Sequence, residues 1–280
     1  MLFIIIKHLL QMNYHFSSHS SFTSGPLNDA PSNTGHLSHS RLRWLSLLLG
    51  AIAMGCFLPP SVIRAETTSI TDAFGETGQR TFGGKLNGTM TDGGNASWVA
   101  TTNLVLGGDS SRSFATVNND ELYLARVAVP TGAKKIRLEA RVQVVPSGEK
   151  ENFVAIGLGN PPSSNITWLG GIVLFMQSSG RAMLMIHPDN HDGQDPNKGG
   201  VEPVKSAACE GFNTTDMNKL SMVYDVEANT VSAWVNDTVI VEEFKLSSKG
   251  FAPVIPFAGF SGYVQQPDAP TVEDFRMTVE

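Results

Sequence analysis

The sequence predicts an all-β protein, a two-sheet antiparallel β-sandwich, in a single domain after an N-terminal signal segment. Apolar and polar residues alternate with a period of two over short segments, most clearly over residues 136–144. There Arg137, Glu139 and Arg141 occupy polar positions, and the apolar residues between them face a core. No window of about 11 residues shows a convincing helical period. Strands that follow one another without intervening helices indicate an antiparallel sandwich.

Each expected strand is bounded by Gly, Pro, Asn or Ser residues, which are typical of turns. A four-residue loop at 178–181 joins two of the strands as a hairpin. Trp98 is expected to fill the core. No internal repeat and no linker interrupts the pattern, so one domain is the simplest account. The expected strands cover residues 122–129, 136–144, 153–158, 171–177, 182–187, 220–226, 230–236, 238–246, 254–263 and 271–279.

Residues 1–65 differ from the rest of the chain and predict a leader that is removed. Arg41 and Arg43 precede an apolar run at 44–58, which two prolines end, and Ala65 follows shortly afterwards. This order is typical of a secretory signal, and the run is shorter than the ~20 residues that a spanning helix needs. We therefore expect secretion or a cell-envelope location after cleavage near Ala65. The β-sandwich then covers residues 66–280, with no transmembrane span in the mature chain.

Cys56 offers a second interpretation of the leader, as the lipidated cysteine of a bacterial lipoprotein. Ala53 stands where Leu is usual in such proteins, which favours ordinary cleavage. Most of the 7 His also lie in the leader, so a metal-binding histidine tract is not expected in the mature chain. Cys209 becomes the one remaining cysteine. Because it has no partner for a disulfide, the core alone must stabilise the exported domain.

Several short motifs occur in a definite order between residues 70 and 280. They are Asp72-Ala73-Phe74, Leu86-Asn87-Gly88-Thr89, Asp92-Gly93-Gly94, Trp98, the segments 152–158 and 168–171, Val235-Asn236-Asp237-Thr238-Val239, and 272–279. In this order they resemble bacterial exported domains of the concanavalin A-like lectin/glucanase superfamily, the LamG-like jelly rolls. The resemblance covers nearly all of that range, and it implies a two-sheet jelly roll with a concave face.

The resemblance also implies a link to carbohydrates, since members of the superfamily bind or cleave them and some bind Ca²⁺. The glucanase branch places its acids on one strand as E-x-D-x-E, as retaining chemistry needs at ~5 Å separation. This chain has no such strand, and no catalytic residue is predicted. Three pairs of acids are candidates: Asp225 with Glu227, Glu242 with Glu243, and Glu273 with Asp274. A turn interrupts the first pair, and the adjacent acids of the other two pairs are expected to face opposite sides of the strand.

Two tryptophans are candidate ligand contacts. Trp234 falls with Ser232 and Asn236 on the polar side of its expected strand, where an indole could stack on the apolar face of a sugar ring. The alternative is that a second layer covers this side. Trp168 follows a loop and is expected at the rim of a site. For Arg137, Glu139 and Arg141, a solvated face with cross-strand ion pairs is favoured over a binding surface.

The segment 187–200 is the richest in potential ligands. His187 and His191 are candidate ligand contacts, and Asp189, Asp192 and Asp195 are candidate Ca²⁺ ligands, because Ca²⁺ prefers oxygen donors on flexible loops. The spacing does not fit an EF-hand. The alternative is a long solvated loop with Asp-Gly and Asp-Pro turns, which is the favoured interpretation.

The sequence thus favours a secreted, non-catalytic jelly-roll module that binds carbohydrate or another cell-surface polymer. One alternative is a polysaccharide-active enzyme, a glycoside hydrolase or lyase, on the same fold. Another is a structural protein of the envelope or matrix. A net charge of −6 argues against a dedicated nucleic-acid partner, and no pattern specifies an oligomeric state.

Overall fold

The computed structural model describes residues 67–76, 80–109, 112–117, 122–146, 152–160, 168–187, 202–209, 211–263 and 271–280. The expected leader, with Cys56 and the cleavage position at Ala65, lies outside these ranges. So do the loop residues Asp189, His191, Asp192 and Asp195. No helix within the described ranges has both the length and the apolar character to cross a lipid bilayer.

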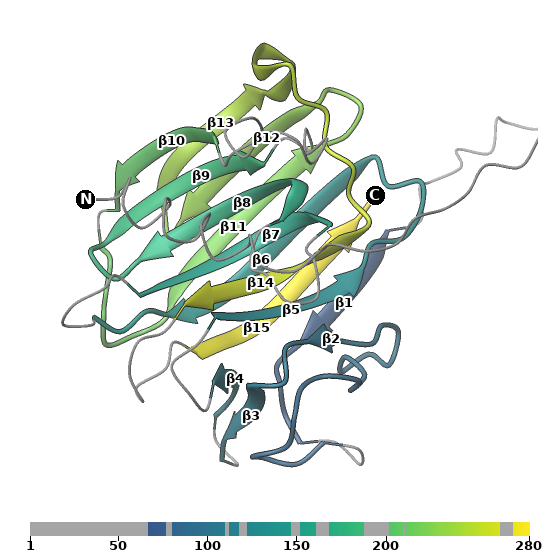
Figure 1. Cartoon of the computed structure of the whole chain (residues 1–280), viewed down its shortest axis with the longest axis vertical. Coiled ribbons are helices and arrows are strands. Elements are labelled where there is room, and N and C mark those ends of the chain that lie inside the picture. The colour runs from purple at the N-terminus through teal and green to yellow at the C-terminus, as the bar shows by residue number, and fades with distance from the viewer. Residues whose placement is uncertain are drawn as a thin grey trace, which may run out of the picture. The chain divides into compact units, whose positions relative to one another are not determined.

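The described domain is built from antiparallel strands in two sheets, drawn as two layers in Figure 1. The 8-stranded sheet has the order β13-β12-β11-β6-β15-β4-β3, with β1 paired to β15, and the 7-stranded sheet has the order β10-β9-β8-β7-β14-β5-β2. The strands are β1 (Thr68–Asp72), β2 (Val99–Ala100), β3 (Leu104–Gly108), β4 (Ser113–Val117), β5 (Leu122–Ala128), β6 (Lys135–Gln143), β7 (Phe153–Asn160), β8 (Leu169–Gln177), β9 (Arg181–His187), β10 (Glu202–Ala208), β11 (Asn218–Asp225), β12 (Thr230–Val235), β13 (Thr238–Lys245), β14 (Phe257–Tyr263) and β15 (Thr271–Val279); a short 3-10 helix, Leu246–Lys249, follows β13.

The core lies between the two sheets and explains the period of two in the sequence. In β6, Ile136, Leu138 and Ala140 are buried, and Arg137 and Arg141 alternate with them on the exposed side. Strand β12 follows the same rule, whereas β7 and β8 are buried on both faces and show no such alternation. Burial of one face of each strand against the other sheet is the main stabilising contribution. The predicted two-sheet antiparallel sandwich is confirmed.

Five strands did not emerge from the sequence pattern: β1, β2, β3, β4 and β10. These segments are short or contain Ser, Thr, Gly or Pro, and they alternate weakly, so local propensity does not identify them. Strands β3 and β4 pair with each other, whereas β1 depends on a distant partner. Strand β1 pairs with the C-terminal strand, with Thr68 opposite Val279 and Asp72 opposite Phe275. The N-terminal strand of the domain therefore depends on a partner about two hundred positions later in the chain.

A buried polar cluster ties the segment after β1 to the sandwich. The guanidinium of Arg80 donates to both oxygens of Asp72, with Nη1 2.8 Å from Oδ1 and Nη2 2.5 Å from Oδ2. The indole Nε1 of Trp98 also donates to Asp72 Oδ2, at 2.5 Å. Asp72, Arg80 and Trp98 are all at most 2% exposed. A buried carboxylate is tolerated here because a cation and several donors satisfy it.

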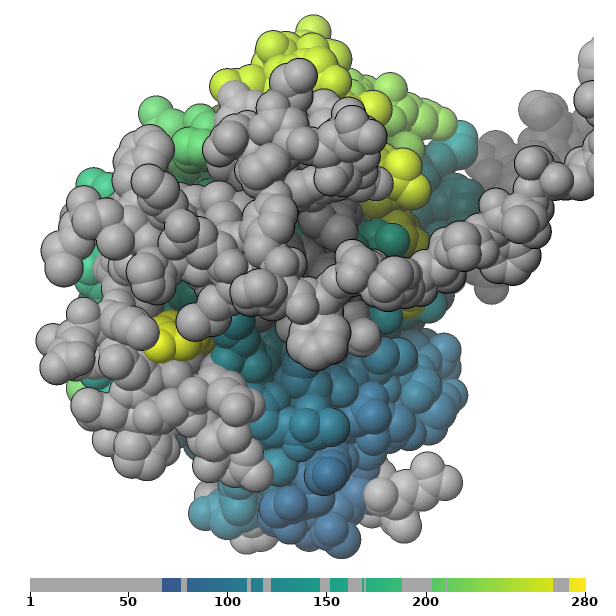
Figure 2. All heavy atoms as spheres, viewed as in Figure 1, coloured from purple at the N-terminus to yellow at the C-terminus, as the bar shows by residue number. Residues whose placement is uncertain are grey.

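Asp92 shares the same guanidinium from the solvent side. Its Oδ1 lies 3.2 Å from Arg80 Nη1, and its Oδ2 accepts a hydrogen bond from the backbone N–H of Ala73. Partial burial and the nearby charge of Asp72 raise the pKa of Asp92, and the bond from Ala73 and the charge of Arg80 oppose this. Asp92 therefore forms the solvent-facing side of the cluster of Asp72, Arg80 and Trp98. In Figure 2 the residues of this region, coloured blue, form one contiguous mass.

Trp98 joins this polar cluster to an aromatic group in the core, as expected from the sequence. Its ring centroid lies 5.4 Å from that of Phe260 and 5.0 Å from that of Phe275, both in edge-on arrangements. Phe74 packs at 5.9 Å from the same indole. These rings come from the N-terminal segment and from both sheets, so one side chain holds three parts of the domain together.

Replacing Arg80 with methionine is expected to destabilise the domain strongly, because Asp72 would remain buried without its cation. Breaking a buried ion pair typically lowers the free energy of unfolding by about 3–5 kcal/mol. Urea titration of wild type and Arg80→Met measures the change. Lys134→Met is the matched control, because Lys134 and Glu227 form an exposed pair expected to contribute less than about 1 kcal/mol. Equal small losses in both variants would contradict a stabilising role for the cluster.

Candidate functional site

Trp234 lies on the outer face of the 8-stranded sheet, the face turned away from the core. Its neighbours in β12, Ala233 and Val235, are fully buried, whereas the Trp234 side chain is half-buried. Its cross-strand partners are Ser221 of β11 and Val239 of β13. The predicted position of Trp234 on the polar side of its strand is confirmed; its contact with a ligand stays a prediction.

A polar row continues from Trp234 across the sheet. Ser221 is opposite both Trp234 and Glu139 of β6, and Glu139 is in turn opposite Arg276 of β15. Ser221 Oγ donates to Glu139 Oε1 at 3.3 Å, and Lys219 Nζ lies 2.7 Å from the same oxygen. The indole is therefore flanked on one side by a hydrogen-bonded hydroxyl, carboxylate and ammonium group. The expected cross-strand ion pairs on this face are present.

The ionised form of Glu139 is stabilised by its surroundings. Partial burial alone would raise the pKa of this carboxyl group. The hydrogen bond from Lys219 and the charges of Lys219 and Arg137, with a smaller contribution from Ser221, outweigh burial and lower the pKa below its ordinary value. Glu139 is thus a carboxylate over the whole physiological pH range.

A β-bulge in β15 corrects one expectation. Glu273 and Asp274 were expected to face opposite ways, but Asp274 has a positive φ of 48° and the register shifts between Glu273 and Arg276. The extra residue brings both carboxylates to Arg141, whose Nη1 lies 3.5 Å from Glu273 Oε2 and 3.1 Å from Asp274 Oδ2. Arg112 Nε also donates to Glu273. Strict alternation does not apply where a bulge inserts one residue.

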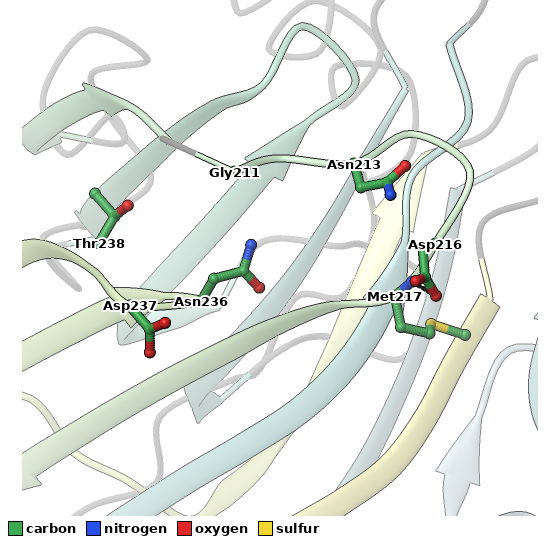
Figure 3. Close-up of a pocket in the computed structure, with 7 residues that line it drawn as sticks. All are labelled: Gly211, Asn213, Asp216, Met217, Asn236, Asp237 and Thr238. Carbon is green, nitrogen blue, oxygen red and sulfur yellow. Dashed lines mark hydrogen bonds between the residues drawn. The ribbon is translucent and has the colours of Figure 1, made fainter.

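A pocket of about 520 Å³ lies at the end of β12 nearest Trp234. Two segments line it, the loop after β10 and the turn between β12 and β13, and Figure 3 shows them on facing sides. Asn236 lies two residues after Trp234, and Thr238 directly precedes its cross-strand partner Val239. The pocket and the indole therefore lie at the same end of the strand. The lining residues are Gly211, Asn213, Asp216, Met217, Asn236, Asp237 and Thr238.

A buried asparagine holds the two sides of the pocket together. Asn218 is fully buried, and its Nδ2 donates to the carbonyls of Asn213 at 2.7 Å and Asp216 at 3.3 Å. Its Oδ1 accepts from Asn213 N–H and from Asn236 Nδ2, both at 3.1 Å. Asn236 itself has a φ of 49°, a conformation that Asn tolerates in turns. The pocket is therefore preformed by a satisfied amide network.

The sequence did not reveal this pocket. The Asn236 and Asp237 turn was visible in the sequence, but its approach to residues 211–217 depends on the crossing from β10 to β11. The lining combines apolar surface with polar groups: carboxylates of Asp216 and Asp237, amides of Asn213 and Asn236, and the hydroxyl of Thr238. Such groups suit a ligand with many hydroxyl groups.

Trp168 is not at the rim of a site, contrary to the sequence-based expectation. Its side chain is fully buried against the outer face of the 7-stranded sheet, in a second apolar cluster with Leu124, Ala155 and Val173. Its Nε1 donates to Ser261 Oγ at 3.1 Å. Gly157 leaves room for the ring, because a Cβ there would lie 2.4 Å from the indole. The sequence shows the glycine but not which side chain fills the space it leaves.

His187 is the one residue of the expected loop site that the structure describes. It ends β9 and is 5% exposed, so it is part of the sheet rather than of an open loop. The described residues contain no group of three or more His, Cys, Asp or Glu side chains that could hold a metal ion. The predicted Ca²⁺ ligands Asp189, Asp192 and Asp195, and the ligand contact His191, lie outside the described residues and stay predictions.

Comparison with known proteins concerns the fold alone. No model of a protein family matches this chain, and no curated protein matches its sequence. Similar solved structures include the carbohydrate recognition domain of Emp47p (10% identity, 75% of this chain and 93% of that chain, TM-score 0.48). An endo-1,3-β-glucanase from Streptomyces sioyaensis is 15% identical to this chain. The match covers 77% of this chain and 97% of that chain, with a TM-score of 0.47. The Ca²⁺- and Man2-bound exoplasmic/lumenal domain of VIP36 is 10% identical to this chain. The match covers 70% of this chain and 85% of that chain, with a TM-score of 0.46.

Gly157→Ala is expected to lower stability, because its methyl group would overlap the buried indole of Trp168. Overpacking of this kind costs about 1–3 kcal/mol of unfolding free energy, and urea unfolding followed by tryptophan fluorescence measures it. Gly75→Ala is the matched control, because the nearest atom to a Cβ there is Ser113 Oγ at 3.9 Å. If both variants were as stable as wild type, the packing of Trp168 on Gly157 would be refuted.

The stability that Glu139 provides is expected to depend on pH. Its pKa in the folded state lies below the unfolded value of about 4.3, so its contribution is fully present above that value. The contribution is lost as the pH falls through the folded pKa. Urea midpoints should therefore differ between wild type and Glu139→Gln at neutral pH, and the difference should shrink below about pH 4. Glu227→Gln, in an exposed pair, is the control. A difference that grows toward acid pH would contradict the expectation.

Proposed function

We propose that this domain is an exported carbohydrate-binding module without catalytic activity. The observation that supports it is the position of a half-buried Trp234 on a polar sheet face, at the same end of β12 as an oxygen-rich pocket. A sugar offers an apolar C–H face that stacks on an aromatic ring, and hydroxyl groups that need hydrogen-bond partners. An indole beside amide, carboxylate and hydroxyl groups provides both kinds of contact.

The acids of this face favour binding over hydrolysis. Glycoside hydrolysis needs one carboxyl group that stays protonated until it donates to the leaving oxygen. Glu139 is held as a carboxylate by Lys219, and Glu273 is paired with Arg112 and Arg141. Asp92 has a raised pKa, but its neighbour Asp72 is buried and bound to Arg80. These carboxylates therefore act as acceptors and ion-pair partners.

Export and Ca²⁺ belong to the same proposal. Cleavage near Ala65 would release residues 66–280 as the mature module. Asp189, Asp192 and Asp195 would supply the carboxylate oxygens that Ca²⁺ prefers as ligands. Thermal unfolding with added Ca²⁺ and with a chelator tests the metal separately from the sugar, since a bound ion raises the melting temperature without any glycan.

Trp234→Ala is expected to weaken glycan binding about tenfold or more, through loss of the stacking surface. A glycan array with the mature chain identifies ligands, and calorimetry then compares the variants. Trp234→Phe should retain most of the affinity, and Val254→Ala, at an exposed position outside the site, should retain all of it. Unchanged melting temperatures would separate lost contact from lost folding.

Three results would overturn the proposal. Equal affinity of Trp234→Ala and wild type would place the ligand elsewhere. Release of reducing ends or unsaturated sugars from a polysaccharide panel would favour the enzyme. An array without any bound glycan, together with a protein partner recovered by crosslinking at the cell surface, would favour a structural role in the envelope or matrix.

A further inference from the structure

Two arginines on the face that carries Trp234 have no ion-pair partner among the described residues. Arg137 of β6 and Arg276 of β15 are both exposed, and neither guanidinium lies within 4.0 Å of a carboxylate of the described residues, although the charge of Arg137 acts on Glu139 at longer range. Arg276 is opposite Glu139, and Arg137 is opposite Thr278. On adjacent antiparallel strands these are diagonal neighbours on one side of the sheet. We call this pair, together with Trp234, the arginine face.

Most other cations on this side of the sheet are bound to a carboxylate: Arg112 and Arg141 to Glu273, Lys219 to Glu139, and Lys135 to Asp225. Lys245 of β13, opposite Thr230, is a further exposed cation of this face. From β11 to β15 this face holds four acids, namely Glu139, Asp225, Glu273 and Asp274, and six cations. Strand β13 adds Glu242, Glu243 and Lys245 beside Trp234, so the face carries charges of both signs and its cations are concentrated around β6 and β15.

The spacing suits an oligomer rather than a single small anion. The row Trp234, Ser221, Glu139 and Arg276 crosses from β12 to β15, three strand spacings, or about 14 Å. Arg137 is one strand nearer to Trp234. A sugar stacked on the indole can therefore present a charged group to the arginines only through further units of the same chain.

The chemistry of the pair selects carboxylate groups. A guanidinium binds a carboxylate through two parallel N–H donors, which fixes its orientation as well as its charge. The acids interspersed among the cations, Glu139 beside Arg276 above all, repel a ligand with a high density of negative charge. Sparse carboxylates, one on each sugar unit, fit this mixed surface better than sulfate clusters or a nucleic-acid backbone do.

We propose that the arginine face binds a uronic-acid-containing glycan, with sugar units stacked from Trp234 outward and carboxylates on Arg137 and Arg276. This inference names the ligand class of the proposed carbohydrate site and rests on that function. Ser221 and Glu139 lie between the indole and Arg276. The Ser221 hydroxyl would donate to or accept from the hydroxyl groups of the intervening sugar, and the Glu139 carboxylate would accept from them.

Calorimetry on the mature chain with matched ligand pairs tests the charge of the ligand. Oligogalacturonate, oligomannuronate and hyaluronan oligosaccharides are compared with the same oligosaccharides after reduction of the carboxyl groups, which removes the charge and keeps the length. We expect at least one uronate oligosaccharide to bind about tenfold more tightly than its reduced form, with an affinity that falls as the salt concentration rises.

Substitution of the arginines tests the place of binding. Arg137→Gln and Arg276→Gln should each weaken binding of the uronate oligosaccharide about tenfold and leave binding of the reduced form unchanged. Arg181→Gln, which removes the same charge from an exposed position on β9 in the other sheet, is the matched control and should change neither. Melting temperatures of the three variants verify that they fold.

Each outcome decides either the inference or the function on which it rests. Equal binding of charged and reduced oligosaccharides, unaffected by both arginine variants, would overturn the uronate inference and keep the carbohydrate function. Tighter binding of heparin or of single-stranded DNA of equal length would overturn it in favour of a general polyanion surface. Absence of binding to all of the uronate oligosaccharides would also overturn it, and the neutral-glycan measurements on Trp234→Ala would still decide the function.

Discussion

The buried pair of Asp72 and Arg80 is the contact on which much of the remaining structure depends. Asp72 ends β1, Arg80 follows eight residues later, and Trp98 joins them to the aromatic residues of both sheets. A bare carboxylate at this depth would be strongly unfavourable, so the segment between β1 and β2 must fold over it. Because β1 pairs with β15, this contact also supports the strand that carries Arg276.

On the outer face of the 8-stranded sheet, side chains follow the regular alternation of the strands, and a β-bulge in β15 departs from it. Alternation places Trp234, Ser221, Glu139 and Arg276 in a single row across four strands. The bulge at Asp274 then turns a second acid toward Arg141, so that Arg112 and Arg141 are neutralised. Arg137 and Arg276, on the same face as Trp234, form no ion pair with the acids of the described residues. The proposed uronate contact rests on this difference between paired and unpaired cations.

Sequence patterns predicted the strands from residue 122 onward except β10, by alternation in strands such as β6 and by apolar runs in strands such as β7. The same reasoning placed Trp234 outside the core and Trp98 within it. It failed between residues 68 and 117, where alternation is weak and β1 and β4 pair with the C-terminal strand β15. It also failed at Trp168, whose burial depends on a space above Gly157. In both cases strand pairing or packing, not the local pattern, decides the outcome.

The amino-acid sequence by itself determined the fold class, the orientation of the side chains in the longer strands, and the exclusion of an E-x-D-x-E catalytic strand. These properties depend on residues within a few positions of one another. Only the tertiary structure decided three further properties. Asp72, Arg80, Asp92 and Trp98 form one cluster, the 211–217 loop meets the β12–β13 turn, and Arg137 and Arg276 form no ion pair with a described acid. Such properties depend on strand register and on a bulge, which bring together residues that no local pattern relates.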